Sequence, residues 1–335
     1  MERFSAVKIL IAARDSLYAA DPTAGAMKRA GGLGDRGPTC LAADPWVTSR
    51  AWCGTSDGTV LRSDDEGATW SVVAEVGEEV TAVAASPAER DVVWLGTEPS
   101  AVYRSADGGA SWERREGLLA LPSSSEWSFP PRPETHHVRW IACHPAESGR
   151  LWVAIEAGAL VTTPDGGATW RDRVPDGPYD THELAVHAER PETLRVAAGD
   201  GYFESEDGGA TWASPERGLR VTYLRSVAID PGDPDVAVVS AASRPRSAYV
   251  AGHSDGRLYR RVGEGVWERV VDGWPEPLDT IAPLLTAGRT PGELWAADER
   301  GIHRSEDGGA SWERIAAFPE SPPSLRALAI TSEGG

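Results

Sequence analysis

Three histidines and three acidic residues in the middle of the sequence have the chemistry to hold and use a metal ion. The candidate metal ligands are His136, His137 and His182, and the candidate catalytic carboxylates are Glu156, Glu183 and Asp200. Imidazole together with carboxylate suits zinc, iron or manganese, and water activated by such a metal gives hydrolase or lyase chemistry. The spacing is not that of a metal motif such as His-Glu-x-x-His, so the fold must bring these residues together.

A second hypothesis uses the neighbouring cations. Arginine binds a carboxylate or a phosphate with two hydrogen bonds, and histidine adds further donors. The candidate substrate-binding residues are Arg139, Arg225, Arg244, Arg246, His253 and Trp127. Trp127 either forms an aromatic lid or anchors a proline-rich loop in a hydrophobic seam. The alternative to both hypotheses is a set of polar residues at the mouth of a channel, with no ligand.

An internal repeat supplies the elements that position these residues. The pattern Ser/Thr-x-Asp-x-Gly-x-Thr/Ser-Trp occurs at residues 63–70, 105–112, 163–170, 205–212 and 305–312. Successive copies start 42, 58, 42 and 100 positions apart, which indicates a 42-residue unit, two 16-residue insertions and one unit that has lost the pattern. Each unit contains four short strand-like runs. The sequence therefore predicts an all-β fold, a β-propeller with four antiparallel strands per blade.

The repeated pattern itself predicts a tight turn before the last strand of each blade. Its Asp accepts hydrogen bonds from the backbone of the turn, its Gly supplies a positive φ, and its Trp covers the turn. Further tryptophans recur shortly before four of the copies, at Trp52, Trp94, Trp152 and Trp295. We assign these tryptophans to packing between repeats.

The two ends of the chain predict how the propeller closes. The last apolar run, residues 325–330, resembles the first strand at residues 224–229, whereas residues 7–30 supply only three strands. We expect a composite first blade made of residues about 5–30 and 324–331, which leaves no exposed sheet edge at the junction. The other blades start near Thr39, Thr81, Val138, His182, Leu224 and Thr280, which gives seven blades in a single domain of residues 1–335.

The insertions predict which face of the propeller carries the site. They fall near residues 117–134 and 243–255, in connections that emerge opposite the repeated turns. Long loops usually serve binding or gating, so we expect the site on the face opposite the repeated turns. We call it the box-free face. His144 and His187 follow first strands and are expected to cap turns, whereas His303 is expected on a solvated strand.

The repeated pattern resembles the Asp-box, or BNR repeat, of sialidases, sortilin-type receptors, photosystem II assembly factors and many bacterial propellers. The resemblance covers nearly the whole chain and implies a sialidase-like propeller fold. It implies little about activity, because the box is a turn on the face away from sialidase catalysis. The chain departs from sialidases in lacking a Phe/Tyr-Arg-Ile-Pro segment near residue 1 and in having one blade more.

Charge and composition argue against some classes of binding partner and cofactor. A formal charge of −18 argues against nucleic acid and anionic membranes. The apolar run at residues 7–13 is too short for a signal peptide or a membrane span, and the three cysteines suit a reduced, cytoplasmic protein. No glycine-rich phosphate loop indicates a nucleotide cofactor. The oligomeric state has no signal in the sequence.

Two functions remain. The first is a metal-assisted hydrolase or lyase that acts on a small anionic substrate. The second is a non-catalytic ligand-binding or protein-assembly scaffold, as in the photosystem assembly factors that the repeat resembles.

Overall fold

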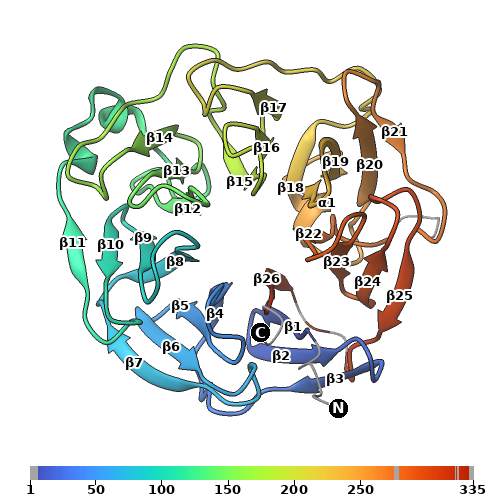
Figure 1. Cartoon of the computed structure of the whole chain (residues 1–335), viewed down its shortest axis with the longest axis horizontal. Coiled ribbons are helices and arrows are strands. Elements are labelled where there is room, and N and C mark those ends of the chain that lie inside the picture. The colour runs from blue at the N-terminus through green and yellow to red at the C-terminus, as the bar shows by residue number, and fades with distance from the viewer. Residues whose placement is uncertain (1–6, 275–278, 321, 323, 332–335) are drawn as a thin grey trace. The chain divides into compact units, whose positions relative to one another are not determined.

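The chain folds as a seven-bladed β-propeller, as the repeat predicts (Figure 1). The computed structural model describes residues 7–274, 279–320, 322 and 324–331. The blades belong to two compact units, of which unit 1 contains Met1–Asp172 and Phe318–Gly335 and unit 2 contains Arg173–Ala317.

Unit 1 contains blades one to four. Blade one is β26 (Leu325–Ile330), β1 (Ile9–Ala13), β2 (Ser16–Asp21) and β3 (Ala26–Arg29). Blade two is β4 (Pro38–Ala43), β5 (Ala51–Thr55), β6 (Thr59–Ser63) and β7 (Ser71–Glu75). Blade three is β8 (Glu79–Ala85), β9 (Val93–Glu98), β10 (Val102–Ser105) and β11 (Glu113–Arg115). Blade four is β12 (Val138–Cys143), β13 (Leu151–Ile155) and β14 (Ala159–Thr163), preceded by the short 3₁₀ helices η1 (Leu118–Ala120) and η2 (Pro122–Glu126).

Unit 2 contains blades five to seven. Blade five is β15 (Thr181–Val186), β16 (Leu194–Ala198) and β17 (Gly201–Ser205). Blade six is β18 (Tyr223–Asp230), β19 (Asp233–Ala242), β20 (Arg257–Val262) and β21 (Glu268–Arg269), with helix α1 (Pro245–Tyr249) between β19 and β20. Blade seven is β22 (Leu284–Ala287), β23 (Leu294–Asp298), β24 (Gly301–Ser305) and β25 (Glu313–Ala316).

Blade one closes through the two ends of the chain, as predicted. β26 pairs antiparallel with β1, and the two strands lie side by side in Figure 1. Ile330 lies opposite Ile9, and Thr331 extends the pairing through a 3.0 Å hydrogen bond from its backbone N–H to the Lys8 carbonyl.

The second strands of the blades lie in the core because neighbouring blades cover both of their faces. All five residues of β13 are buried, and Trp52, Trp94, Trp152 and Trp295 are at most 2% exposed. Gly96 of β9 shows how close the blades approach, since a Cβ atom there would lie 2.3 Å from Cγ1 of Val138 in blade four. The repeat tryptophans therefore serve packing.

Blades four and five have three strands instead of the four expected. Their outermost segments are reduced to single bridges, between Thr162 and Arg171 and between Glu204 and Ala213. Pro175 and Pro215 follow these bridges closely. Proline has no backbone N–H, so it cannot extend the strand pairing.

The repeated turns have the hydrogen bonding that their sequence predicts. In blade three, the Asp107 carboxylate accepts hydrogen bonds from Ser105 Oγ at 2.8 Å, Ser111 N at 2.9 Å and Ser111 Oγ at 2.6 Å. Trp112 closes the turn by donating from Nε1 to the Gly109 carbonyl at 3.1 Å. These bonds hold the pKa of Asp107 down, at about 2.

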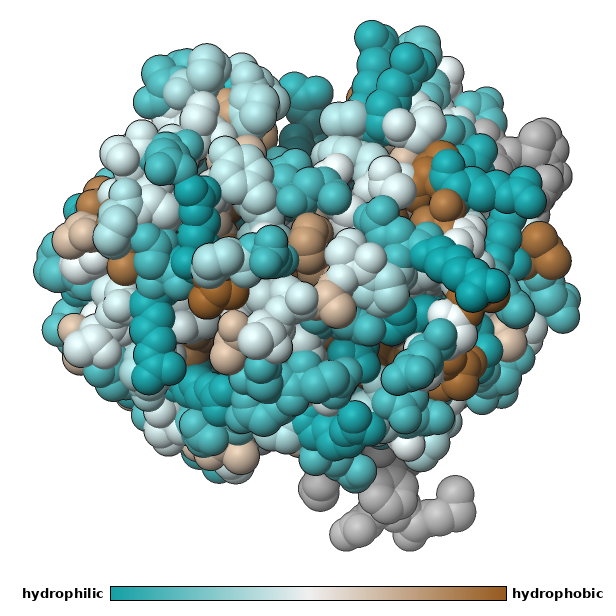
Figure 2. Space-filling model, turned by 90° about the horizontal axis from the view of Figure 1, so that it is seen from above, coloured by the Kyte–Doolittle hydropathy of each residue, from teal (hydrophilic) through white to brown (hydrophobic). Residues whose placement is uncertain are grey.

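Among the described residues, no helix has the length and apolarity that a membrane crossing requires. Figure 2 shows a face on which hydrophilic residues predominate and hydrophobic ones form small, separate patches.

Candidate functional site

The predicted residues of unit 1 meet around His137. This histidine lies just before β12 and is buried, and its Nε2 atom lies 3.0 Å from Glu156 Oε2 on the turn between β13 and β14. On the other side of the ring, Nδ1 lies 3.6 Å from Oε2 of Glu98, at the end of β9. The start of a first strand and two turns between second and third strands therefore meet on the box-free face.

Arginines neutralise both of these carboxylates. Arg139 Nε lies 3.1 Å from Glu156 Oε2, and Arg132 Nη2 lies 2.6 Å from Glu98 Oε2. We call these five residues, Glu98, Arg132, His137, Arg139 and Glu156, the His137 cluster. Burial raises the pKa of Glu98 above its usual value, although His137 and Arg132 oppose the shift. Burial, with a smaller effect of His137, lowers the pKa of the adjacent His136.

The first insertion reaches this cluster with a turn at residues 129–132. The backbone N–H of Arg132 donates to the Phe129 carbonyl at 2.7 Å, and the Arg132 guanidinium lies over the Phe129 ring at 5.4 Å. Phe129 in turn meets the His137 ring edge-on, with ring centroids 4.6 Å apart. Trp127 is 5% exposed, packs with the hydrophobic core between blades three and four, and donates from Nε1 to Ser123 Oγ at 3.0 Å. Of the two alternatives for Trp127, the hydrophobic anchor describes its surroundings.

His182 belongs to unit 2 and is buried there on β15. Its Nδ1 hydrogen-bonds the Leu224 carbonyl, so the proton of the neutral ring lies on Nδ1. Its Nε2 faces the Tyr223 hydroxyl at 3.3 Å and Asp180 Oδ2 at 3.9 Å. The Asp200 carboxylate accepts a hydrogen bond from the backbone N–H of Asp180 at 3.1 Å. These contacts fix the entry into β15.

Two other predicted residues of unit 2 are engaged inside the protein. Arg225 is 2% exposed and donates from Nη1 to the carbonyls of Ala248 at 3.3 Å and Ala282 at 2.6 Å, with its guanidinium 4.7 Å from the Tyr249 ring. It therefore ties α1 to the segment that enters blade seven. Glu183 is 8% exposed and accepts a hydrogen bond from Ser226 Oγ on the neighbouring blade.

The second insertion carries the remaining predicted residues. Arg244 and Arg246 are exposed at the start of α1, and His253 is exposed on the loop that follows it. Arg244 donates from Nε to Ser247 Oγ at 3.3 Å. In unit 2 these three side chains lie on the surface, whereas Arg225 is buried beneath α1.

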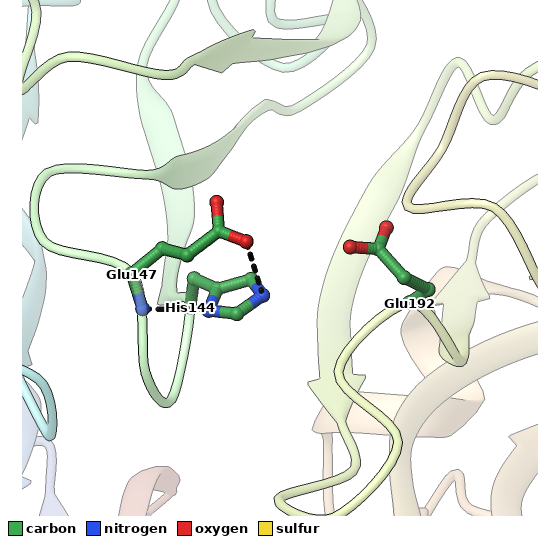
Figure 3. Close-up of side chains that lie close together, drawn as sticks. All are labelled: His144, Glu147 and Glu192. Carbon is green, nitrogen blue, oxygen red and sulfur yellow. Dashed lines mark hydrogen bonds and ion pairs between the residues drawn. The ribbon is translucent and has the colours of Figure 1, made fainter.

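The turn histidines behave as predicted. His144 Nδ1 accepts hydrogen bonds from the backbone N–H groups of Ala146 at 3.1 Å and Glu147 at 2.9 Å, and its Nε2 lies 3.7 Å from Glu147 Oε1 (Figure 3). His187 Nδ1 likewise accepts from the N–H groups of Glu189 and Arg190. Each imidazole caps the turn that follows a first strand.

The expectation for His303 was wrong. This histidine is 2% exposed and lies in a closed environment, with its ring centroid 4.8 Å from that of Trp274. The reason is that the segment at residues 270–274 covers β24 before the chain enters blade seven. Trp274 is not part of the repeated pattern, and its irregular position was the sequence feature that could have indicated a cover over β24.

Comparisons with known proteins show the fold. No family model and no curated protein matches the sequence. Among solved structures, the GH74 enzyme of Niastella koreensis is similar with a TM-score of 0.70 at 15% identity, over 91% of this chain and 51% of that one. YCF48 from Cyanidioschyzon merolae is similar with a TM-score of 0.59 at 16% identity, over 86% of each chain. A structure of YCF48 bound to D1 peptide gives 0.58 at 19% identity, over 82% of this chain and 80% of that one.

This chain spans about half the length of the GH74 enzyme. At these identities the likeness extends to the β-propeller fold and to nothing finer.

Proposed function

We propose that this protein is a non-catalytic binding or assembly propeller whose box-free face in unit 1 recognises a protein or peptide partner. The observation that carries the proposal is the pairing of Arg132 with Glu98 at 2.6 Å. This ion pair uses a carboxylate of the His137 cluster to fix the inserted loop. A second pair, Arg139 with Glu156, occupies the other carboxylate of the His137 cluster.

The inserted loop has the properties of a preorganised contact surface. Residues 130–134 are exposed, and three of these five are proline. Proline restricts the backbone before binding, and Arg132 anchors the tip, so little conformational entropy is lost when a partner docks. YCF48, a propeller with the same fold at 19% identity, binds a peptide in its solved structure.

A partner can be sought with a matched pair of variants. Arg132→Glu reverses the charge of the loop tip, and Asp107→Asn weakens a repeated turn on the opposite face. We expect the wild-type protein and Asp107→Asn to retain the same cross-linked partner from a lysate of the source cells, and Arg132→Glu to lose it. The proposal fails if Arg132→Glu, still folded, retains the partner.

A metal-assisted hydrolase or lyase remains the sequence-based rival. To bind a metal, His137 and Glu156 would have to give up their present contacts with each other and with Arg139, which costs free energy. We expect wild-type protein purified without a histidine tag to retain no stoichiometric zinc, iron or manganese by elemental analysis after incubation with each. Stoichiometric metal that is lost in His137→Ala and kept in the turn variant His144→Asn would favour the enzyme instead.

One observation favours a hydrolase without reference to a metal. Burial raises the pKa of Glu98, whereas Glu156 lies 3.1 Å from Arg139 Nε and 3.0 Å from His137 Nε2. Two carboxyl groups in different surroundings can divide the roles of general acid and general base. A hydrolytic activity that is lost in both Glu98→Gln and Glu156→Gln would support this second candidate.

A further inference from the structure

A cavity of about 450 Å³ lies in unit 2, beside the outer strands of blade seven. Its walls are Val271, Gly273, Trp274, Arg300, His303 and Arg314. This volume is in the range that holds small organic ligands. The cavity is separate from every residue that the sequence predicted for a site.

A close backbone approach holds Trp274 in the wall of the cavity. Gly273 has a φ of 66°, and a Cβ atom there would lie 1.7 Å from the Trp312 carbonyl oxygen, so only glycine fits. The Trp312 backbone N–H donates to the Asp272 carbonyl at 3.2 Å. The Trp274 ring packs edge-on against Trp312, with centroids 5.9 Å apart.

Three buried polar atoms of the residues that line the cavity have no hydrogen-bond partner among the described residues. They are Nε1 of Trp274, a donor, and both ring nitrogens of His303; both residues are at most 3% exposed. A buried polar group without a partner costs about 1–3 kcal/mol. Most such groups in folded proteins are satisfied, so these two side chains point to a ligand that supplies an acceptor and a donor.

The chemistry of His303 follows from Asp298. This fully buried carboxylate lies 3.6 Å from His303 Nε2 and accepts a hydrogen bond from Arg300 Nε at 2.9 Å. Burial opposes ionisation, but the neighbouring His303 and Arg300 outweigh it and lower the pKa of Asp298. The Asp298 carboxylate is nearer to Nε2 and favours the tautomer with the proton there, in which Nδ1 is an acceptor.

Arg314 adds a positive charge at the mouth. It lies opposite His303 in the pairing of β24 with β25, so both side chains leave the sheet on the same face, about 5 Å apart at Cβ. Arg314 is exposed and forms no ion pair with any residue the structure describes, whereas Arg300 is neutralised by Asp298. Arg314 is thus available for an anion.

We propose that this cavity binds a small organic acid: a carboxylate paired with Arg314, an apolar body beside Val271 and Trp274, and a hydroxyl or amine that donates to His303 Nδ1. The indole N–H of Trp274 donates to an acceptor on the same ligand. This site is independent of the function proposed for unit 1.

Calorimetric titration with three probes tests the proposal. We expect 3-hydroxybenzoate to bind more tightly than benzoate, which lacks the hydroxyl donor, and about tenfold or more tightly than 3-hydroxybenzamide, which lacks the charge. In Arg314→Gln the preference for the carboxylate over the amide should disappear. The matched control is Arg304→Gln. Arg304 is next to His303 in the sequence but on the other face of β24, where it pairs with Glu293 and Glu306. This variant should still prefer the carboxylate over the amide.

A nuclear magnetic resonance measurement locates the ligand. The indole N–H signal of Trp274, identified by its loss in Trp274→Phe, should shift when 3-hydroxybenzoate is added. Arg314 is exposed, so its variant should fold, and thermal melting checks this. The proposal is overturned if none of the probes binds at millimolar concentration, if the acid and the amide bind equally to the wild type, or if the Trp274 signal stays in place.

Discussion

Arg132 and Glu98 form a 2.6 Å ion pair that joins an inserted loop to the end of a strand 34 residues earlier in the chain. The Glu98 side chain is 7% exposed and that of Arg132 is 48% exposed. Removal of Arg132 should therefore destabilise the fold more than removal of Glu98, because it leaves the buried Glu98 carboxylate without a compensating charge.

The raised pKa of Glu98 predicts a specific dependence of stability on pH. A carboxyl whose pKa is raised on folding favours the protonated form, so its contribution to stability falls as the pH rises from 4.5 through the folded pKa. In Glu98→Gln this decline should be smaller. Urea unfolding of wild type and variant at a series of pH values measures the difference, and parallel curves would contradict the assignment.

The repeated turns predict the opposite dependence. The pKa of Asp107 falls from 3.8 to about 2 on folding, so its contribution is present above pH 3.8 and is lost as the pH falls towards 2. Asp107→Ala should also remove turn hydrogen bonds worth about 1 kcal/mol each at neutral pH. Asp64→Asn, at an exposed ion pair with Arg62, is the control and should change stability little. Equal losses in the two variants would refute the structural role of the box Asp.

The turn histidines should be replaceable by other hydrogen-bond acceptors, as other copies of the repeat show. Asp44 and Asp230 occupy the position of His144 and accept backbone hydrogen bonds there, as at Trp46 N and Gly232 N. His144→Asn keeps an acceptor and should melt near the wild type, whereas His144→Leu should lose about 1–2 kcal/mol. Thermal and urea melts compare the two, and a variant with asparagine as unstable as the one with leucine would disprove the cap.

The pairing of β26 with β1 predicts the effect of truncation. Removal of residues 322–335 would expose the apolar edge of β1, so we expect aggregation or a large loss of stability. Size-exclusion chromatography and calorimetry measure both effects. A truncated chain that melts with the full-length protein would show that this strand pairing contributes little.

The sequence predicted the fold well because each blade repeats one local rule. The Asp and Gly of each box and the tryptophan ahead of it recur at fixed spacing, and local turn chemistry with blade packing decides their positions. The candidate site was harder, because ion pairing is set by side chains that are distant in sequence. Nothing in the sequence near Arg132 indicates that it pairs with Glu98. Likewise, nothing near Arg225 indicates that it donates to the carbonyls of Ala248 and Ala282. His303 was missed because its cover, Trp274, lies outside the repeat.

The join between β26 and β1 also orders events during synthesis. Unit 2 is one continuous stretch, Arg173–Ala317, and leaves the ribosome whole, whereas unit 1 needs residues near both 9 and 330. Blade one must wait, with the edge of β1 unpaired, while more than 300 residues are made. A released chain that ends before residue 325 should therefore have unit 2 protected from protease and β1 open to it.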